Sequence, residues 1–284
     1  MSPPLPPGRL VELPGRGTTF VRETGPSNAP ALFLLHGLSA SADLNWFTTF
    51  RSLSSAYRVV ALDQRGHGRG IRLRGRRFRL ADCADDVVVL ADALGIDRFV
   101  PVGYSMGGAV AQLVVHRQPE RVAGLVLCAT ARNFTSNRPA NRVGFAALAG
   151  MSAAARLTPT AVRRQVTATF LRGRAQEGQL ALWVRSELLR NDPSAVMQAA
   201  VAIGNFSSRD WLGAVDVPAA VVVTTRDRLV PPPRQYKMAE AIRGATIHPV
   251  PGDHGVCVAR PDLFVPALLD ACRSVTGRAA TVRP

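Results

Sequence analysis

The chain has 284 residues, of which 47% are hydrophobic and 19% are charged. This balance is typical of a folded globular protein and excludes a mainly disordered chain. Lysine and arginine together number 35 against 20 aspartates and glutamates, a formal net charge of +15, and Lys237 is the only lysine. Such a charge fits a nucleic-acid binder, a protein that acts at an anionic membrane or on an acidic substrate, or an ordinary arginine-rich enzyme.

Targeting signals are absent from the sequence pattern. The first residues contain no apolar stretch of signal-peptide length, and no run of about 18 apolar residues occurs further on. The cysteines Cys83, Cys128, Cys257 and Cys272 show no metal-type spacing, so we expect reduced thiols. A cytoplasmic location follows as the expectation, with peripheral attachment to a membrane left open.

Short apolar runs alternate with longer segments of helical period. This alternation predicts βαβ units and a mostly parallel sheet covered by helices on both faces. In chain order the predicted strands are residues 31–35, 58–62, 99–102, 122–129, 219–225 and 245–250. Helices are predicted over residues 80–94 and from just after Ser105 to Val115. We expect residues 1–14 and 278–284 to be loose.

The alternation breaks between residues 133 and 211. No good strand occurs there, and helical segments are predicted at residues 143–155, 159–171, 179–190 and 194–205. Polar, turn-forming residues lie at both ends of this stretch. We therefore predict one α/β domain, with residues 1–132 and 212–284 forming the core and residues 133–211 forming an inserted helical cap.

The strongest local motif is Gly103-Tyr104-Ser105-Met106-Gly107-Gly108, directly after a predicted strand and directly before a helix. A nucleophile on a strained strand-to-helix turn needs small neighbours, which Gly103 and Gly107 supply. Ser105 is therefore the candidate nucleophile. The Met106 N–H, at the helix N-terminus, is a candidate donor to developing negative charge.

A serine hydroxyl reacts only when a base takes its proton, and an acid usually orients that base. His254 lies in the loop Pro251–Gly255 after the last predicted strand, whereas His116 and His248 fit structural or exposed positions better. Asp227 follows the strand at residues 219–225 and is the preferred acid. Asp253 is the alternative, disfavoured because consecutive side chains diverge.

Two further turns follow predicted strands. His36-Gly37-Leu38-Ser39 supplies a second candidate oxyanion donor, the Leu38 N–H, and leaves His36 as a buried, hydrogen-bonded histidine. The loop Asp63-Gln64-Arg65-Gly66-His67-Gly68 fits either an anion-binding turn or a structural loop in which Arg65 and His67 hold neighbouring loops. We favour the structural loop.

Together these motifs resemble the α/β-hydrolase superfamily in its form with a helical cap, from about Thr19 to Cys272. The resemblance implies a mostly parallel central sheet flanked by helices, and hydrolysis through an acyl-serine intermediate. It implies that Ser105 is nucleophile, His254 base and then acid, and Asp227 the orienting carboxylate, with Leu38 and Met106 as oxyanion donors. It also implies that no metal and no organic cofactor take part.

Some members of this superfamily, such as epoxide hydrolases, carry an aspartate at the position of Ser105. The serine in this chain disfavours their chemistry. Carboxylesterases, lactonases, thioesterases, C–C hydrolases and perhydrolases remain, and a carboxylesterase is the broadest fit. A ligand receptor that keeps the fold with little turnover is the alternative from another class. Apolar cap side chains such as Trp183, Ile203 and Phe206 suggest a small-molecule substrate with an apolar acyl group, although they also suit simple packing.

Seven arginines fall between Arg65 and Arg79, before the helix predicted at residues 80–94. Because aromatic residues make up only 6% of the chain and do not interleave with this cluster, a nucleic-acid role is not expected. The sequence leaves a solvated arginine loop, or a contact with anionic lipid or an acidic substrate group. It gives no indication of the oligomeric state.

Overall fold

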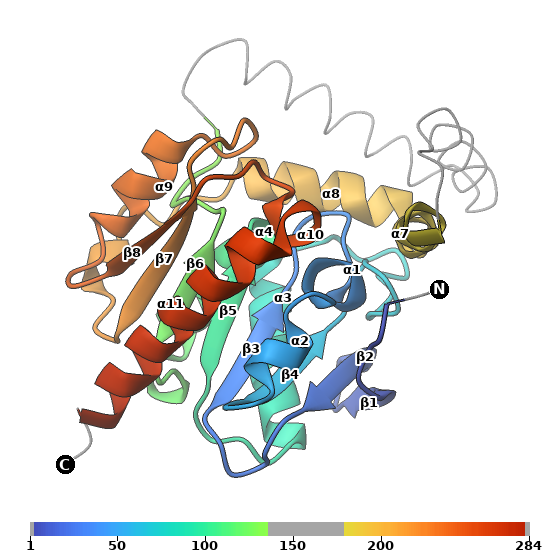
Figure 1. Ribbon diagram of the computed structural model, residues 1–284. Helices are drawn as coiled ribbons and strands as arrows, with labels where there is room; N and C mark the ends of the chain where they lie inside the picture. The colour runs from blue at the N-terminus through green and yellow to red at the C-terminus, as the bar shows by residue number, and fades with distance from the viewer. Residues whose placement is uncertain (1–2, 136–178, 282–284) are drawn as a thin grey trace.

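A twisted eight-stranded sheet forms the centre of the computed structural model, which describes residues 3–135 and 179–281 (Figure 1). The strand order is β1-β2-β4-β3-β5-β6-β7-β8. The strands are β1 (Gly8–Leu13), β2 (Gly17–Thr24), β3 (Ala31–Leu35), β4 (Arg58–Leu62), β5 (Val100–Tyr104), β6 (Leu125–Cys128), β7 (Ala219–Thr224) and β8 (Thr246–Val250). The strands from β3 to β8 pair in parallel and β2 pairs antiparallel with both neighbours, which confirms the predicted α/β class.

Both faces of the sheet are buried, as the continuous apolar strands predict. All of β3 is buried, with Phe33 and Leu35 in one hydrophobic cluster and Leu32 and Leu34 in the other. The first cluster contains α3 (Leu80–Ala93), α4 (Met106–Arg117) and α9 (Pro232–Ala239). The second contains α1 (Ala42–Trp46), α2 (Phe50–Leu53), α10 (Val256–Ala259) and α11 (Pro261–Thr281). The short 3₁₀ turns η1 (Pro119–Arg121) and η2 (Leu212–Ala214) complete the connections.

The chain ends differ from the prediction. Residues 8–13 are not loose but form β1, an edge strand in an antiparallel hairpin with β2. Only Val11 and Leu13 of β1 are buried. Two buried positions are too few for an alternation of apolar and polar residues to predict a strand from the sequence alone. At the other end, α11 continues to Thr281, past the predicted boundary at residue 278. The structure also contains β2 and the helices α1, α2, α9, α10 and α11, which the sequence pattern does not predict.

The described part of the insertion is helical. It contains α7 (Gln179–Leu189) and α8 (Pro193–Gly204), close to the predicted segments at residues 179–190 and 194–205. Asn133 and Ser207 form an antiparallel bridge, so the chain leaves and re-enters the core at one place. Figure 1 shows α8 lying across the carboxyl edge of the sheet. The helices predicted at residues 143–155 and 159–171 lie outside the described residues, and the core and cap boundaries stay a prediction.

The four cysteines are buried and free, in line with the expected reduced thiols. Among the helices of residues 3–135 and 179–281, none combines the length and the apolar character needed to cross a bilayer.

Candidate active site

Ser105 lies on a sharp turn between β5 and α4 with φ 54° and ψ −114°, a conformation that a residue with a side chain rarely adopts. The neighbouring backbones approach too closely for side chains. A Cβ on Gly103 would lie 2.3 Å from the Gly107 carbonyl oxygen, and one on Gly107 would lie 2.0 Å from the Leu35 carbonyl oxygen. The glycines at these positions are therefore required by the turn that presents Ser105, as the motif predicts.

The loop after β8 carries His254 to this serine. The His254 Nε2 atom lies 2.9 Å from Ser105 Oγ, and the Nδ1 atom lies 2.7 Å from Asp227 Oδ2. Since a carboxylate only accepts hydrogen bonds, Nδ1 carries the proton and Nε2 is free to accept one from the hydroxyl. The Tyr104 hydroxyl donates to the His254 carbonyl oxygen at 2.7 Å and so fixes the loop. The structure thus brings the three sequence-predicted side chains into one hydrogen-bonded chain.

Asp227 is held as a carboxylate at the carboxyl end of β7. Its side chain is fully buried, and Oδ1 accepts from the backbone N–H groups of Leu229 and Val230 at 2.8 and 2.9 Å. The Thr224 hydroxyl donates to Oδ2 at 2.8 Å. Burial raises the pKa of Asp227, but the hydrogen bonds from His254, Val230 and Thr224 outweigh it, and the pKa lies below its usual value.

The alternative residues weighed from the sequence have other partners. Asp253 is exposed and accepts from the Gly255 N–H at 2.9 Å rather than from His254. His116 is exposed and stacks on Trp211 with ring centroids 4.2 Å apart. His248 lies on β8, where its Nε2 atom is 3.0 Å from the Thr246 hydroxyl. The preference for Asp227 and His254 therefore agrees with the geometry.

The turn after β3 passes directly beside Ser105. A Cβ on Gly37 would lie 3.4 Å from Ser105 Cβ, and the Gly37 N–H donates to Asn45 Oδ1 at 2.9 Å. Within the described residues, the backbone N–H groups of Leu38 and Met106 donate to no protein acceptor. Two unused donors thus lie on the segments that flank the serine, at the places where the sequence predicts an oxyanion hole.

His36 and His67 form a pair of buried, neighbouring histidines, called the second histidine centre to distinguish it from His254. His36 accepts from the Gln64 N–H through Nε2 at 2.9 Å and donates through Nδ1 to the Gly37 carbonyl at 2.8 Å. Burial lowers the pKa of His36 to about 4. Burial, with His36 as neighbour, lowers the pKa of His67 to about 3. Both rings therefore remain neutral, and His36 is the buried, hydrogen-bonded histidine that the sequence predicts.

The loop that begins at Asp63 is structural, as expected. Arg65 is buried and binds Asp86 of α3 with both ends of its guanidinium, at 2.7 and 2.6 Å, so it holds a helix rather than a neighbouring loop. Arg69 binds Asp63 at 3.1 Å and Asp43 at 2.8 Å. The expectation of a solvated arginine loop is wrong for these two arginines, because the buried carboxylates of Asp86, Asp43 and Asp63 neutralise them.

Several residues that hold the active-site loops in place could not be predicted from the sequence. The Gln235 amide donates to the Thr224 hydroxyl at 2.7 Å, behind Asp227. Asn191, from the turn between α7 and α8, donates to the Ser39 carbonyl at 2.7 Å and accepts from the Gly68 N–H at 2.9 Å. No local motif marks Gln235 or Asn191, and the motif around Ser105 does not reveal the contact of Tyr104 with the His254 loop, because each acts across a contact that only the folded chain creates.

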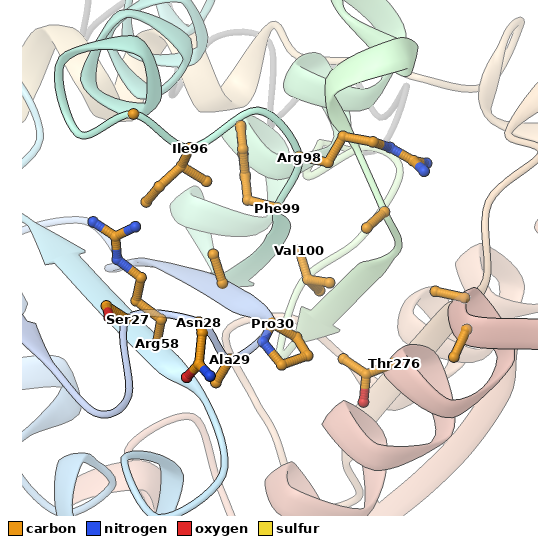
Figure 2. A pocket seen from close by; sticks show the side chains of 15 residues that line it. Ser27, Asn28, Ala29, Pro30, Arg58, Ile96, Arg98, Phe99, Val100 and Thr276 are labelled. Carbon is orange, nitrogen blue, oxygen red and sulfur yellow. The ribbon is translucent and has the colours of Figure 1, made fainter. Parts of the chain in front are cut away.

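A cavity of about 520 Å³ lies at the opposite edge of the sheet (Figure 2). Its lining includes Ala31 and Val100, the first residues of β3 and β5, whereas Ser105 follows the last residue of β5. Arg58 also lines it and is paired with Glu23 at 2.7 Å. This cavity is therefore separate from the hydrogen-bonded chain at Ser105.

Comparisons with known proteins agree with the architecture. The family model for the alpha/beta hydrolase fold matches residues 30–261. A Variovorax paradoxus protein with the provisional name carbamate hydrolase RutD is 32% identical over 255 residues, covering 87% of this chain and 92% of the relative. A non-heme chloroperoxidase of Streptomyces lividans is 28% identical over 280 residues, covering 90% of this chain and 96% of the relative. The crystal structure of a Pseudomonas aeruginosa hydrolase aligns with a TM-score of 0.79 at 23% identity, covering 93% of this chain and 98% of that one.

Proposed function

The chain belongs to the alpha/beta hydrolase fold family, and from that premise we propose that it is a serine hydrolase that cleaves carboxylic esters. The observation that carries the proposal is the unbroken hydrogen-bonded chain from Ser105 Oγ through His254 to Asp227. Such a chain makes a serine hydroxyl nucleophilic at neutral pH. Family membership supports hydrolysis, and the choice of an ester rests on the chemistry of the site.

In the proposed reaction, Ser105 Oγ attacks the ester carbonyl carbon while its proton passes to His254 Nε2. The buried Asp227 carboxylate stabilises the imidazolium that forms. The tetrahedral intermediate then expels the alcohol, which takes the proton from His254, and leaves an acyl group on Ser105. Water attacks the acyl-serine with His254 again as base, releasing the carboxylic acid and restoring the hydroxyl.

The carbonyl oxygen gains negative charge in both tetrahedral intermediates. The free N–H groups of Leu38 and Met106 are the proposed donors to it, and the N-terminus of α4 adds its partial positive charge. Backbone donors are positioned before substrate arrives, so they stabilise the intermediate without reorganisation. This sequence of proton transfers and additions is complete with protein groups and water, and we propose no metal or organic cofactor.

An apolar acyl group is part of the proposal. Its support is the apolar character of the cap, whose buried residues Ile203 and Phe206 pack in the same hydrophobic cluster as α3 and α4. Rates measured with p-nitrophenyl esters from acetate to decanoate test it. Acetate turned over far faster than butyrate and longer esters would count against an apolar acyl pocket.

A carbamate is the second candidate, and the Variovorax paradoxus relative is the observation that favours it. Ser105 would attack the carbamate carbonyl in the same way and expel the alcohol, leaving a carbamoyl-serine. Water would hydrolyse this to a carbamic acid, which breaks down to an amine and carbon dioxide, with the same roles for His254 and Asp227. Parallel kcat/KM measurements on an ester and a carbamate of matched size separate the two. A carbamate preference over the matched ester would replace our choice.

One screen tests the proposal as a whole. Wild-type protein and Ser105→Ala are assayed against esters, thioesters, lactones and carbamates. We expect ester turnover that disappears in Ser105→Ala. Folded wild-type protein that turns over none of these, and that a fluorophosphonate does not label, would favour the receptor alternative instead.

A further inference from the structure

The seven arginines between Arg65 and Arg79 differ in their partners, and Arg72 donates to the Gly68 carbonyl at 2.9 Å. Arg65 and Arg69 bind buried carboxylates, as described above. Arg74, Arg76, Arg77 and Arg79 are exposed, and in residues 3–135 and 179–281 none of their side chains has an acidic or hydrogen-bonding partner. Four unneutralised cations thus occur within six residues.

A tight turn displays these four arginines, and residues 72–79 are called the arginine turn below. Arg74 and Gly75 both have positive φ, 45° and 84°, and the Arg76 N–H donates to the Leu73 carbonyl at 2.8 Å. This is the geometry of a two-residue left-handed turn. Leu73 and Phe78 are each only 6% exposed and anchor the two ends. The arginine side chains are therefore held outward by an ordered scaffold.

The arginine turn lies on the same side of the molecule as the candidate active site. It follows the carboxyl end of β4, which is parallel to β5, the strand that ends before Ser105. The Phe78 N–H donates to Gln198 of α8 at 3.1 Å, and α8 crosses that edge in Figure 1. A partner bound by the arginine turn would therefore adjoin the cap and the carboxyl edge of the sheet.

We propose that the arginine turn binds an anionic phospholipid surface. Arginines near such a surface each add to the attraction, which falls off within a Debye length. The aromatic side chain of the turn, Phe78, is buried and offers no platform for stacked bases, which favours lipid over nucleic acid. Docking does not depend on the proposed hydrolysis, but it would present the Ser105 edge to acyl lipids if that function holds.

Vesicle co-sedimentation tests the proposal, using Ser105→Ala protein so that lipid is not consumed. The vesicles contain phosphatidylcholine alone or with phosphatidylserine. In the test variant Arg74, Arg76, Arg77 and Arg79 become Gln. In the matched control Arg117, Arg243, Arg260 and Arg273, which are exposed but paired with acids, become Gln, so the net charge falls equally.

We expect binding only to phosphatidylserine vesicles, abolished by high salt. The partition coefficient should fall about a hundredfold or more in the test variant, given roughly one tenfold step for each one or two arginines, and little in the control. Equal losses in the two variants, or binding that ignores phosphatidylserine, would overturn the proposal. So would tight binding of duplex DNA by protein that ignores the vesicles. Melting temperatures of both variants check that the fold is retained.

A second inference concerns Asn191 and rests on the proposed function. Asn191 is only 6% exposed, and its side chain joins three segments. It accepts from the Gly68 N–H at 2.9 Å and donates to the carbonyls of Ser39 and Leu188 at 2.7 and 3.1 Å. One amide therefore links the cap to the loop after β4 and to the turn after β3.

The Ser39 contact matters because Ser39 follows Leu38, a proposed oxyanion donor. Ser39 has φ 60°, so the turn is held in an unfavourable conformation. Asn45 fixes its start through the Gly37 N–H, and Asn191 fixes its end through the Ser39 carbonyl. We infer that Asn191 is a positioning residue that aims the Leu38 N–H at the carbonyl oxygen of the substrate.

Asn191→Asp tests this inference, because aspartate keeps the size and the acceptor to Gly68 but loses the donor to Ser39. We expect kcat for a short-chain ester to fall about 10- to 100-fold with KM changed less than about threefold. Gln198→Ala, which removes a cap contact to Phe78 away from the turn after β3, is the control and should leave kcat unchanged.

The possible results separate the two claims. Equal kcat in wild-type protein and Asn191→Asp would overturn the positioning role and leave the proposed function standing. Equal losses of kcat in Asn191→Asp and Gln198→Ala would show a general effect of the cap and overturn it as well. Absence of ester turnover in the wild type would remove the proposed function and this inference together.

Discussion

His254 and His67 both lie in loops at the carboxyl edge of the sheet, but their ring nitrogens have different partners. His254 is partly exposed and lies between a hydroxyl and a carboxylate, at 2.9 and 2.7 Å. His67 is fully buried, donates to the Arg65 carbonyl at 3.1 Å, and has no partner for Nε2 among the described residues. Its neighbour His36 is also fully buried.

The difference teaches how one fold uses the same side chain in two ways. A histidine that must gain a proton during each turnover needs a carboxylate to stabilise the charge. A buried histidine that takes no part in proton transfer is better kept neutral, because a buried imidazolium without a carboxylate is costly. Catalysis should therefore depend on His254, and stability in acid on His36 and His67.

The largest expected effect separates these two centres directly. Ser105→Ala and His254→Ala should each lower kcat/KM by about 10⁴- to 10⁶-fold, because the nucleophile or its base is lost. His67→Asn, which keeps a donor near the Nδ1 position, should leave kcat within about tenfold of wild type. Steady-state rates with a p-nitrophenyl ester provide the measurement. A similar loss in His67→Asn would show that His67, like His254, is needed for the chemistry.

Asp227→Asn should reduce kcat by about 10³- to 10⁴-fold while the protein stays folded, since the amide cannot stabilise the His254 imidazolium. The same ester assay measures it. Asp253→Asn serves as the matched control, because Asp253 is the exposed neighbour without a contact to His254. Equal losses in the two variants would move the orienting role away from Asp227.

Much of this comparison could be predicted from the sequence, because its parts are local. Ser105 stands between glycines on a strand-to-helix turn, and Asp227 and His254 follow late strands, so motif and chain order identify them. Tyr104, Thr224 and Gln235 could not be identified, since their roles depend on which loops meet in space. The edge strand β1 cannot be predicted for a related reason: its pairing with β2, rather than its own apolar pattern, makes it a strand.

Acid should destabilise the fold through the second histidine centre. Burial lowers the pKa of His36 from 6.5 to about 4 and that of His67 from 6.5 to about 3. As the pH falls below 6.5, these histidines therefore bind protons in the unfolded chain but stay neutral in the folded one. The free energy of unfolding should therefore be highest above pH 6.5 and fall as the pH drops toward 4. The loss at pH 4 is about 3 kcal/mol for each ring.

Urea unfolding between pH 7 and pH 4 measures this decline. His67→Asn removes one of the two titrating rings and should flatten the curve over that window. A free energy of unfolding that stays constant from pH 7 to pH 5 in the wild type would contradict the description of both rings as neutral and buried.

The smallest expected effect on kcat comes from the hydroxyl that holds the His254 loop. Tyr104→Phe removes only the hydrogen bond from the hydroxyl to the His254 carbonyl and should lower kcat about 3- to 10-fold, equivalent to about 1 kcal/mol. Tyr57→Phe is a suitable control, because its hydroxyl lies far from ideal hydrogen-bond distance, at 3.5 Å from Thr276. If Tyr104→Phe behaves like the control, the Tyr104 hydroxyl does not help to hold His254 in place.

Covalent labelling tests whether His254 and Asp227 make Ser105 a nucleophile. Folded protein is incubated with a fluorophosphonate, and its intact mass and modified peptide are measured. We predict the addition of one phosphonyl group on Ser105, at a rate much lower in His254→Ala and with no labelling in Ser105→Ala. Undiminished labelling of Ser105→Ala, or no labelling of folded wild-type protein, would show that Ser105 is not the activated nucleophile.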